Sequence, residues 1–126
     1  MAAWVNITFD AALFSAQAGT WTVASGDVTT LAFRIIGKTL QFAWHVVTTT
    51  VSGLPAALWI TIPVSRVAKY KTGVPITVIN AGTAGLGYAE TVAASNVIWI
   101  YRESFTAWSN ATDTTGTSGE LEFEVD

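Results

Sequence analysis

The stretch VTTLAFRIIGKTLQFAWHVV, residues 28–47, decides the fold class of this chain. Apolar residues alternate with others on both sides of Gly37-Lys38, and a period of two places every second side chain on one face of a strand. Glycine in the first turn position suits a type II′ turn, which needs a positive φ there. The stretch therefore predicts a β-hairpin with these residues in the core: Leu31, Phe33, Ile35, Leu40, Phe42, Trp44 and Val46.

Shorter runs of the same kind recur along the chain between glycines, prolines and polar residues. They predict strands at 4–9, 20–23, 57–62, 76–79, 86–92, 96–102 and 120–125. Residues 11–16 predict a helical turn or an extended arm, and 48–55, 65–73 and 109–119 read as loops. We expect one all-β domain, a jelly-roll-like antiparallel β-sandwich of about eight strands. Residues 1–19 would supply a first strand and a possible contact arm of this domain, and residues 20–126 the sandwich.

The composition limits the kinds of partner. Charged residues make up 12% of the 126 residues, about half of the usual share of roughly 25%, which favours an oligomer or a larger assembly. The net charge of −3 argues against nucleic acid. The chain has no cysteine, no recognisable signal peptide and no run of ~18 apolar residues, so we expect no disulfide and no membrane partner.

Few side chains are suited to catalysis. His45 is the only histidine, and it has no partner nearby in sequence, which favours a packing or interface role over that of a general base. Glu120, Glu122 and Glu124 share one strand face, where we expect a solvated acidic surface that protects a sheet edge rather than a cation site. The glycines of residues 82–87 lack the ending of a phosphate loop. We therefore predict no enzyme, no metal and no cofactor.

Six tryptophans are the remaining candidates for a binding role. Trp44 and Trp99 lie on apolar strand faces and are expected in the core, whereas Trp59 alternates with leucine and isoleucine and is expected to face outward. Trp4 and Trp108 lie near strand ends or loops. An exposed tryptophan can stack on a sugar ring or anchor a protein interface, and the sequence leaves both uses open.

Several segments resemble a pattern found in small structural proteins of tailed bacteriophages. These segments are TWTV (20–23), DVTTLAFRIIGKTL (27–40), ALWITIP (57–63) and GELEFEV (119–125). The resemblance implies a virion protein such as a capsid decoration or cement protein, a head fibre or a tail-fibre knob, and many of these assemble as trimers. The chain opens at Met1 directly with the domain, without a shaft or coiled coil, and this favours a separate decoration protein over a fibre tip.

The resulting hypothesis is a homotrimeric cement protein that stabilises a phage head by contact with the major capsid protein. Its location would be the capsid surface of the virion, after synthesis in the host cytoplasm. The candidate capsid or subunit contacts are Trp4, Phe9, Leu13, Phe14, Trp59 and Trp108. The alternative is a receptor- or glycan-binding knob of a head or tail fibre, which predicts two or three exposed aromatic residues gathered on one surface. A depolymerising hydrolase is the weakest reading, because carboxylates are sparse.

Overall fold

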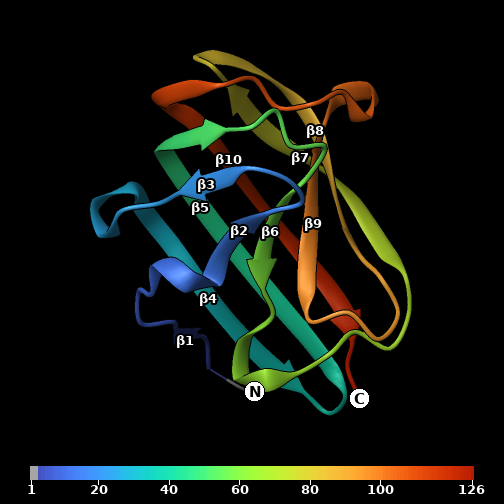
Figure 1. Cartoon of the computed structure of the whole chain (residues 1–126). Helices are drawn as coiled ribbons and strands as arrows, with labels where there is room; N and C mark the ends of the chain where they lie inside the picture. Colours follow the sequence, from blue (N-terminus) through green and yellow to red (C-terminus); the bar gives the residue numbers. More distant parts are fainter. Residues whose placement is uncertain (1–2) are drawn as a thin grey trace.

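The computed structural model describes residues 3–126 and is all-β (Figure 1). Short 3₁₀ turns join some of the strands: η1 (Ala11–Leu13), η2 (Ser25–Asp27), η3 (Pro63–Ser65) and η4 (Glu103–Phe105). Within residues 3–126, no helix has both the length and the apolar character needed to cross a membrane. The ten strands are β1 (Val5–Asn6), β2 (Phe14–Ala16), β3 (Thr20–Thr22), β4 (Val28–Ile36), β5 (Thr39–Ser52), β6 (Leu58–Thr61), β7 (Thr72–Asn80), β8 (Thr83–Thr91), β9 (Val97–Arg102) and β10 (Ala111–Glu124).

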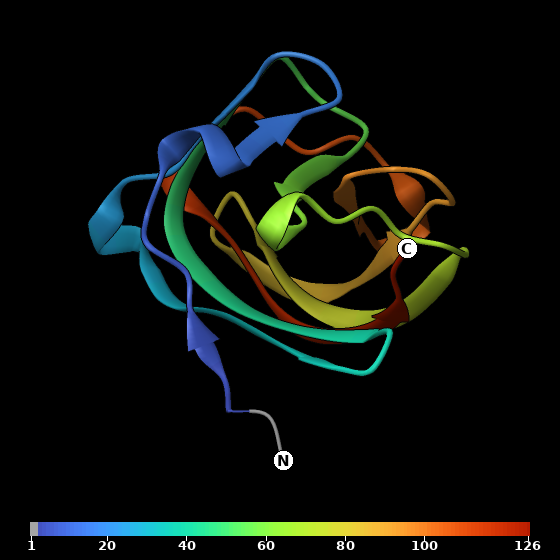
Figure 2. The same ribbon diagram turned by 90° about the horizontal axis from the view of Figure 1, so that it is seen from below.

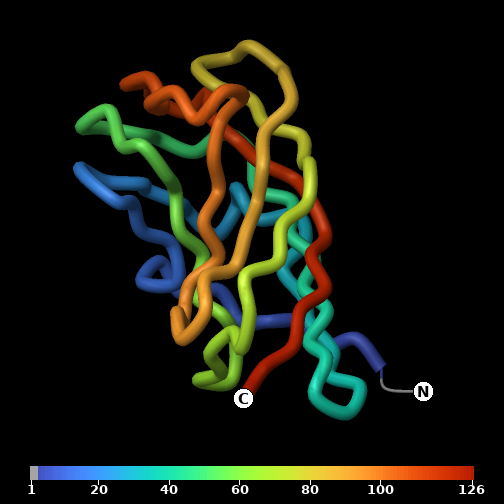
Figure 3. The backbone as a smooth tube through the Cα atoms, turned by 90° about the vertical axis from the view of Figure 1, so that its right-hand side faces the viewer, coloured from blue at the N-terminus to red at the C-terminus, as the bar shows by residue number. Residues whose placement is uncertain are grey.

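The strands form one antiparallel sheet that curls into two packed layers. Its order is β1-β4-β5-β10-β7-β8-β9-β6-β2, and β3 pairs with β5 beside this path. Figure 2 shows the curl from below, and Figure 3 shows the β4–β5 hairpin and β10 in one layer facing β6 and β9 in the other. The expected single-domain all-β sandwich is confirmed, and residues 3–126 form ten strands rather than about eight.

The predicted hairpin forms the centre of one layer. The pairing of β4 with β5 runs from Ile36 opposite Thr39, beside the turn, to Val28 opposite Val46. Gly37 has the positive φ of 63° that the turn requires. Leu40, Phe42 and Val46 are fully buried and Trp44 is 2% exposed. The alternation of the sequence therefore identified the inner face of this hairpin correctly.

Two segments expected as loops are strands. β5 continues to Ser52 past a left-handed residue at Thr48, and β10 begins at Ala111 inside the Thr/Ser/Gly-rich stretch. Threonine is β-branched and fits a pleated strand, and here its hydroxyls also serve buried tryptophans. Trp21 Nε1 donates to Thr49 Oγ1 at 2.8 Å, and Trp44 Nε1 donates to Thr117 Oγ1 at 3.2 Å.

The acidic face of β10 lies beside β5. Glu120, Glu122 and Glu124 pair with β5 on one side, whereas the pairing of β10 with β7 on the other side covers only Gly116–Ser118, so the edge-protecting role stays a prediction. Glu122 also accepts a hydrogen bond from Gln41 Nε2 at 2.6 Å, and Glu124 pairs with Lys69 at 3.4 Å. The predicted orientation is correct, because the alternate residues Leu121, Phe123 and Val125 are all buried.

The N-terminal segment is part of the sandwich. β1 pairs with β4 in one layer and β2 pairs with β6 in the other, so the segment crosses between the layers. The amide of Ile7 also donates to the carbonyl of Leu31 at 2.9 Å. Residues 5–16 therefore do not form a free contact arm, which corrects that part of the prediction.

Candidate functional site

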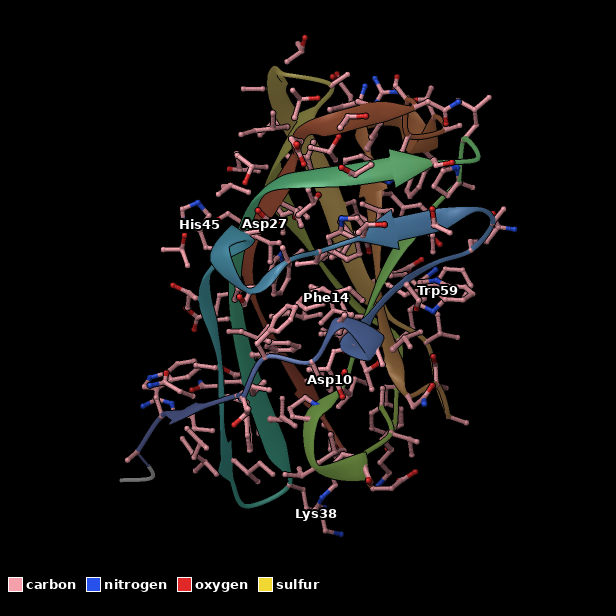
Figure 4. The ribbon with its side chains drawn as sticks, turned by 60° about the vertical axis from the view of Figure 1, so that its left-hand side comes forward. Asp10, Phe14, Asp27, Lys38, His45 and Trp59 are labelled. Atoms are coloured by element: carbon pink, nitrogen blue, oxygen red, sulfur yellow. The ribbon has the colours of Figure 1, made fainter. Side chains whose placement is uncertain are left out.

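Two of the predicted contact residues belong to the core. Trp108 is 0% exposed, and its Nε1 donates to the carbonyl of Ile100 at 3.3 Å. Phe14 is 4% exposed, packs edge-on against Trp21 at 5.3 Å between ring centroids, and lies between the layers (Figure 4). Neither side chain reaches a partner while the chain keeps this fold, so the contact assignment is wrong for both.

The other predicted contacts of the N-terminal segment are only partly available. Phe9 and Leu13 are half-buried against the core, and Phe9 stacks on Phe14 at 6.3 Å. Trp4 is 39% exposed, and its ring lies 4.8 Å from the guanidinium carbon of Arg34. Trp4 thus remains at the surface as one ring held by a cation–π contact.

A groove of about 640 Å³ lies between the N-terminal segment and the end of β6. Its wall combines apolar side chains such as Leu13 and Phe33 with the polar Thr8, Asp10 and Asn96. Asp10 is the one titratable residue among the described lining residues, and its carboxylate already accepts from the amide of Ala12 at 2.9 Å at the start of η1. The groove therefore offers space but no group free for acid–base chemistry.

An uncharged patch lies on the outer face of β5, β10 and β7. The register sets His45 beside Ser118 and Ser118 beside Thr77, so the three form one row across the sheet. Val47 and Ile79 lie next to this row, and the residues surround a shallow hollow of about 70 Å³. We call this surface, made of His45, Val47, Thr77, Ile79 and Ser118, the His45 patch.

A second surface, the aromatic face, lies on the outer side of β6, β9 and β8. Its members are Trp59, Trp99, Tyr101, Phe105 and Tyr88, and consecutive ring centroids in this order are 5.1, 6.3, 4.9 and 5.8 Å apart. The rings point away from the core because the alternating residues of the same strands, Leu58, Ile60, Ile98, Ile100 and Ala89, are fully buried. Apart from Phe105, which is 59% exposed, the rings are half-buried.

Glu90 lies within this aromatic face. It is the register partner of Trp99 and is 7% exposed. Its Oε2 lies 3.3 Å from Lys71 Nζ, yet it accepts no hydrogen bond of good geometry from residues 3–126. The two charges attract at that distance, so we regard Glu90 as ion-paired through Oε2, and the phenol of Tyr101 interacts with the same carboxylate. Trp59 Nε1 and Trp99 Nε1 likewise find no acceptor in the described part of the chain.

The phenol of Tyr101 responds to this environment. Burial, the larger cause, and the negative charge of Glu90 together raise the pKa of Tyr101 from its ordinary 10.0 to about 12. Both causes favour the neutral phenol. Tyr101 therefore stays protonated, as a hydrogen-bond donor, at every physiological pH.

Backbone features hold the rings in place. Ser104 and Phe105 have φ values of 58° and 57°, a left-handed conformation that costs a non-glycine residue about 1–3 kcal/mol and occurs often at binding sites. This turn brings Phe105 against Tyr88 and Tyr101. On β7, a Cβ on Gly73 would lie 1.7 Å from the hydroxyl oxygen of Tyr88, so glycine leaves room for this phenol.

Sequence reasoning identified only one member of the aromatic face. Trp59 faces outward as predicted, but Trp99 was expected in the core and lies on the outer side. Both faces of β9 are apolar, with isoleucines on one and aromatic residues on the other, so periodicity alone does not show which face is inward. Glu90, opposite Trp99 in β8, was the available signal, because an isolated acid belongs outside more often than inside.

Comparisons of the chain with protein-family models, with curated proteins and with solved structures give no match in any of the three. Within residues 3–126, no three histidine or acidic side chains are grouped in a way that would hold a metal ion. The geometry of the two outer surfaces is therefore the basis for any functional proposal.

Proposed function

We propose that this chain is a non-enzymatic structural protein of a phage particle, a capsid decoration or cement protein that self-associates as a homotrimer. The observation that carries the proposal is the His45 patch, an uncharged surface that runs across β5, β10 and β7. The phage assignment and the trimer rest on the resemblance of TWTV, DVTTLAFRIIGKTL, ALWITIP and GELEFEV to virion proteins.

The chemistry of the His45 patch suits contact between protein surfaces. Interface centres are depleted in charged residues, and the patch contains no lysine, arginine, aspartate or glutamate. Val47 and Ile79 supply apolar area, while Thr77, Ser118 and His45 supply hydroxyl and imidazole groups that pair across an interface. The hollow of about 70 Å³ gives a neighbouring side chain a place to insert.

The position of the patch also supports this use. It lies over β5 and β10, whose inner faces belong to the buried core and include Phe42, Trp44 and Val46. A rigid surface loses little conformational freedom on binding. In an oligomer bound to a repetitive shell, several weak contacts act together and give tight attachment.

Sedimentation equilibrium of the purified chain tests self-association, and we expect a trimer. Thr77→Asp places a charge at an exposed position of the patch and should raise the trimer dissociation constant at least tenfold. Thr22→Asp makes the same change at an exposed position of β3, outside the patch, and should leave the trimer intact. A monomeric wild-type chain, or equal behaviour of the two variants, contradicts the proposed interface.

Attachment to the shell requires a separate measurement. Wild-type protein should sediment together with empty capsids of the phage that carries this gene. It should also raise the temperature at which DNA-filled capsids of that phage release their DNA. The cement role is contradicted if the trimer stays in the supernatant at tens of micromolar, which means that its free energy of binding to the capsid is weaker than about −6 to −7 kcal/mol. That result would not affect the proposed trimer.

A further inference from the structure

We propose that the aromatic face is a binding site for neutral carbohydrate, with Glu90 as the acceptor for sugar hydroxyl groups. This inference goes beyond the assembly role, because it gives a ligand to a surface centred on β9 and β6 rather than on β5 and β10. Figure 4 shows His45 and Trp59 at opposite sides of the molecule. A subunit held through the His45 patch therefore leaves the side that carries Trp59 available.

The rings form a strip suited to the apolar side of a sugar. Trp99 and Tyr101, two positions apart on β9, are nearly parallel, with 19° between their planes. Trp59 and Phe105 lie at either side of this pair and are turned by 70° and 71° relative to their neighbours. The face of an aromatic ring carries partial negative charge, and the C–H groups on one side of a pyranose carry partial positive charge, so the two surfaces attract.

Glu90 supplies the polar part of the site. Its carboxylate only accepts hydrogen bonds, and Oε2 receives none of good geometry from residues 3–126. Lys71, which lies over it at 3.3 Å, has a side chain that is 70% exposed and free to move aside. A hydroxyl group entering beside Lys71 would donate to Oε2 and accept from the ammonium, so that both charged groups keep a partner.

The combination distinguishes between classes of ligand. An apolar protein surface would cover Glu90 without giving it a donor, and a buried polar group left unpaired is costly. A nucleotide or an acidic sugar would bring a negative charge next to Glu90, and next to Glu103 in the hollow beside Phe105. The two cations of this surface already have partners, since Lys71 pairs with Glu90 and Arg102 Nη1 donates to the carbonyl of Ala107 at 2.6 Å. A neutral sugar has both an apolar side, which packs on the aromatic rings, and hydroxyl groups, which donate to the carboxylate of Glu90.

The surroundings of Phe105 indicate the size of the ligand. A hollow of about 260 Å³ is lined by Tyr88, Phe105, Pro75 and Leu86, and also by the oppositely charged Arg102 and Glu103. Sites for drug-sized molecules begin at about 300 Å³, so this hollow takes a single sugar unit. The left-handed backbone at Ser104 and Phe105 presents the 59% exposed ring at the border of the hollow. We expect a short oligosaccharide, with one unit in the hollow and its neighbours along the strip.

The first experiment is an array of neutral and acidic glycans probed with the intact, folded chain. We expect binding to neutral oligosaccharides and none to sialylated or sulfated ones. Titration calorimetry with the best neutral oligosaccharide then gives the dissociation constant. If a folded protein binds no neutral glycan of the array, or prefers the acidic ones, the proposal is wrong.

Variants assign the binding to the aromatic face. Phe105→Ala removes an exposed ring from a turn and should raise the dissociation constant at least tenfold, and Glu90→Gln, which keeps the shape of the side chain, should raise it about tenfold. Trp4→Ala removes an exposed aromatic ring outside this face and should change the constant less than twofold. Circular dichroism confirms that each variant is folded.

The same variants separate this site from a subunit interface. If Phe105→Ala dissociates the oligomer, the aromatic face holds a second copy of the chain and the carbohydrate proposal is overturned. If Thr77→Asp gives a monomer that still binds the sugar, the carbohydrate site stands independently of the assembly role. Equal sugar affinity for wild type, Phe105→Ala and Glu90→Gln would also overturn the proposal.

Discussion

Thr49 lies at the centre of a buried hydrogen-bond chain. Its replacement by valine tests how much the buried threonine hydroxyl contributes to the free energy of unfolding. The residue is 0% exposed. Its hydroxyl accepts from Trp21 Nε1 at 2.8 Å and donates to the carbonyl oxygen of Thr115 at 2.7 Å. Thr49→Val keeps the shape of the side chain and removes both hydrogen bonds, so the change isolates their contribution.

The magnitude follows from the two groups that lose a partner. Each buried donor or acceptor left unpaired costs about 1–3 kcal/mol, and the added methyl group returns about 0.8 kcal/mol by its burial. We expect the free energy of unfolding to fall by about 3 kcal/mol. For a chain of 126 residues, an unfolding entropy of about 2.1 cal/mol/K per residue converts this loss to a melting temperature about 11 °C lower.

Urea denaturation followed by tryptophan fluorescence measures the difference. Thr49→Ser keeps the hydroxyl and loses only a methyl group, so it should cost about 1 kcal/mol. Trp21→Phe removes the donor, and a double-mutant cycle with Thr49→Val should give a coupling energy of about 1 kcal/mol or more. If Thr49→Val changes stability by less than 0.5 kcal/mol, a value of the kind seen for ordinary surface substitutions, the role assigned to the hydroxyl is refuted.

Two further predictions concern single side chains. Absorbance titration near 295 nm should show Tyr101 ionising at about pH 12, after an ordinary tyrosine, and Glu90→Gln should lower this pKa because it removes a neighbouring negative charge. The folded pKa lies above the ordinary value, so this contribution to stability is complete below about pH 10 and is lost as pH rises to about 12; a transition near pH 10 that accounts for every tyrosine would disprove it. Trp108→Ala should destabilise the chain by about 3–5 kcal/mol, and the 39% exposed Trp4 should tolerate alanine at a cost below about 1 kcal/mol. If Trp4→Ala lowered the melting temperature more than Trp108→Ala, the burial of Trp108 would be refuted.

The sequence was a good guide wherever one strand face differed from the other. The predicted core residues of β5, Leu40, Phe42, Trp44 and Val46, are buried. In β4, Leu31 is buried, and Phe33 and Ile35 are half-buried against the core. The same contrast placed Glu120, Glu122 and Glu124 on the outer face of β10. A period of two gives the correct answer there because only one assignment of faces buries the apolar side.

The sequence was a poor guide where polar residues, or residues of an expected loop, are buried. The Thr-rich start of β10 reads as a loop, yet Thr115 and Thr117 are buried because their partners across the sheet supply hydrogen bonds. Trp108 reads as a loop residue near the surface, yet the chain folds over it and Ile100 accepts its indole hydrogen. Both outcomes depend on neighbours far away in sequence, which no local pattern records.

The sequence by itself determined an all-β domain, the hairpin around Gly37 and the absence of cysteine and of a large charge. Only the tertiary structure decided that Trp59, Trp99 and Tyr101 share one outer surface with Phe105 and the nearly buried Glu90. Alternation fixes which residues share a face of one strand, but the order β8-β9-β6 decides which strands lie side by side. A surface assembled from three strands and a turn exists only once the sheet has curled and paired them.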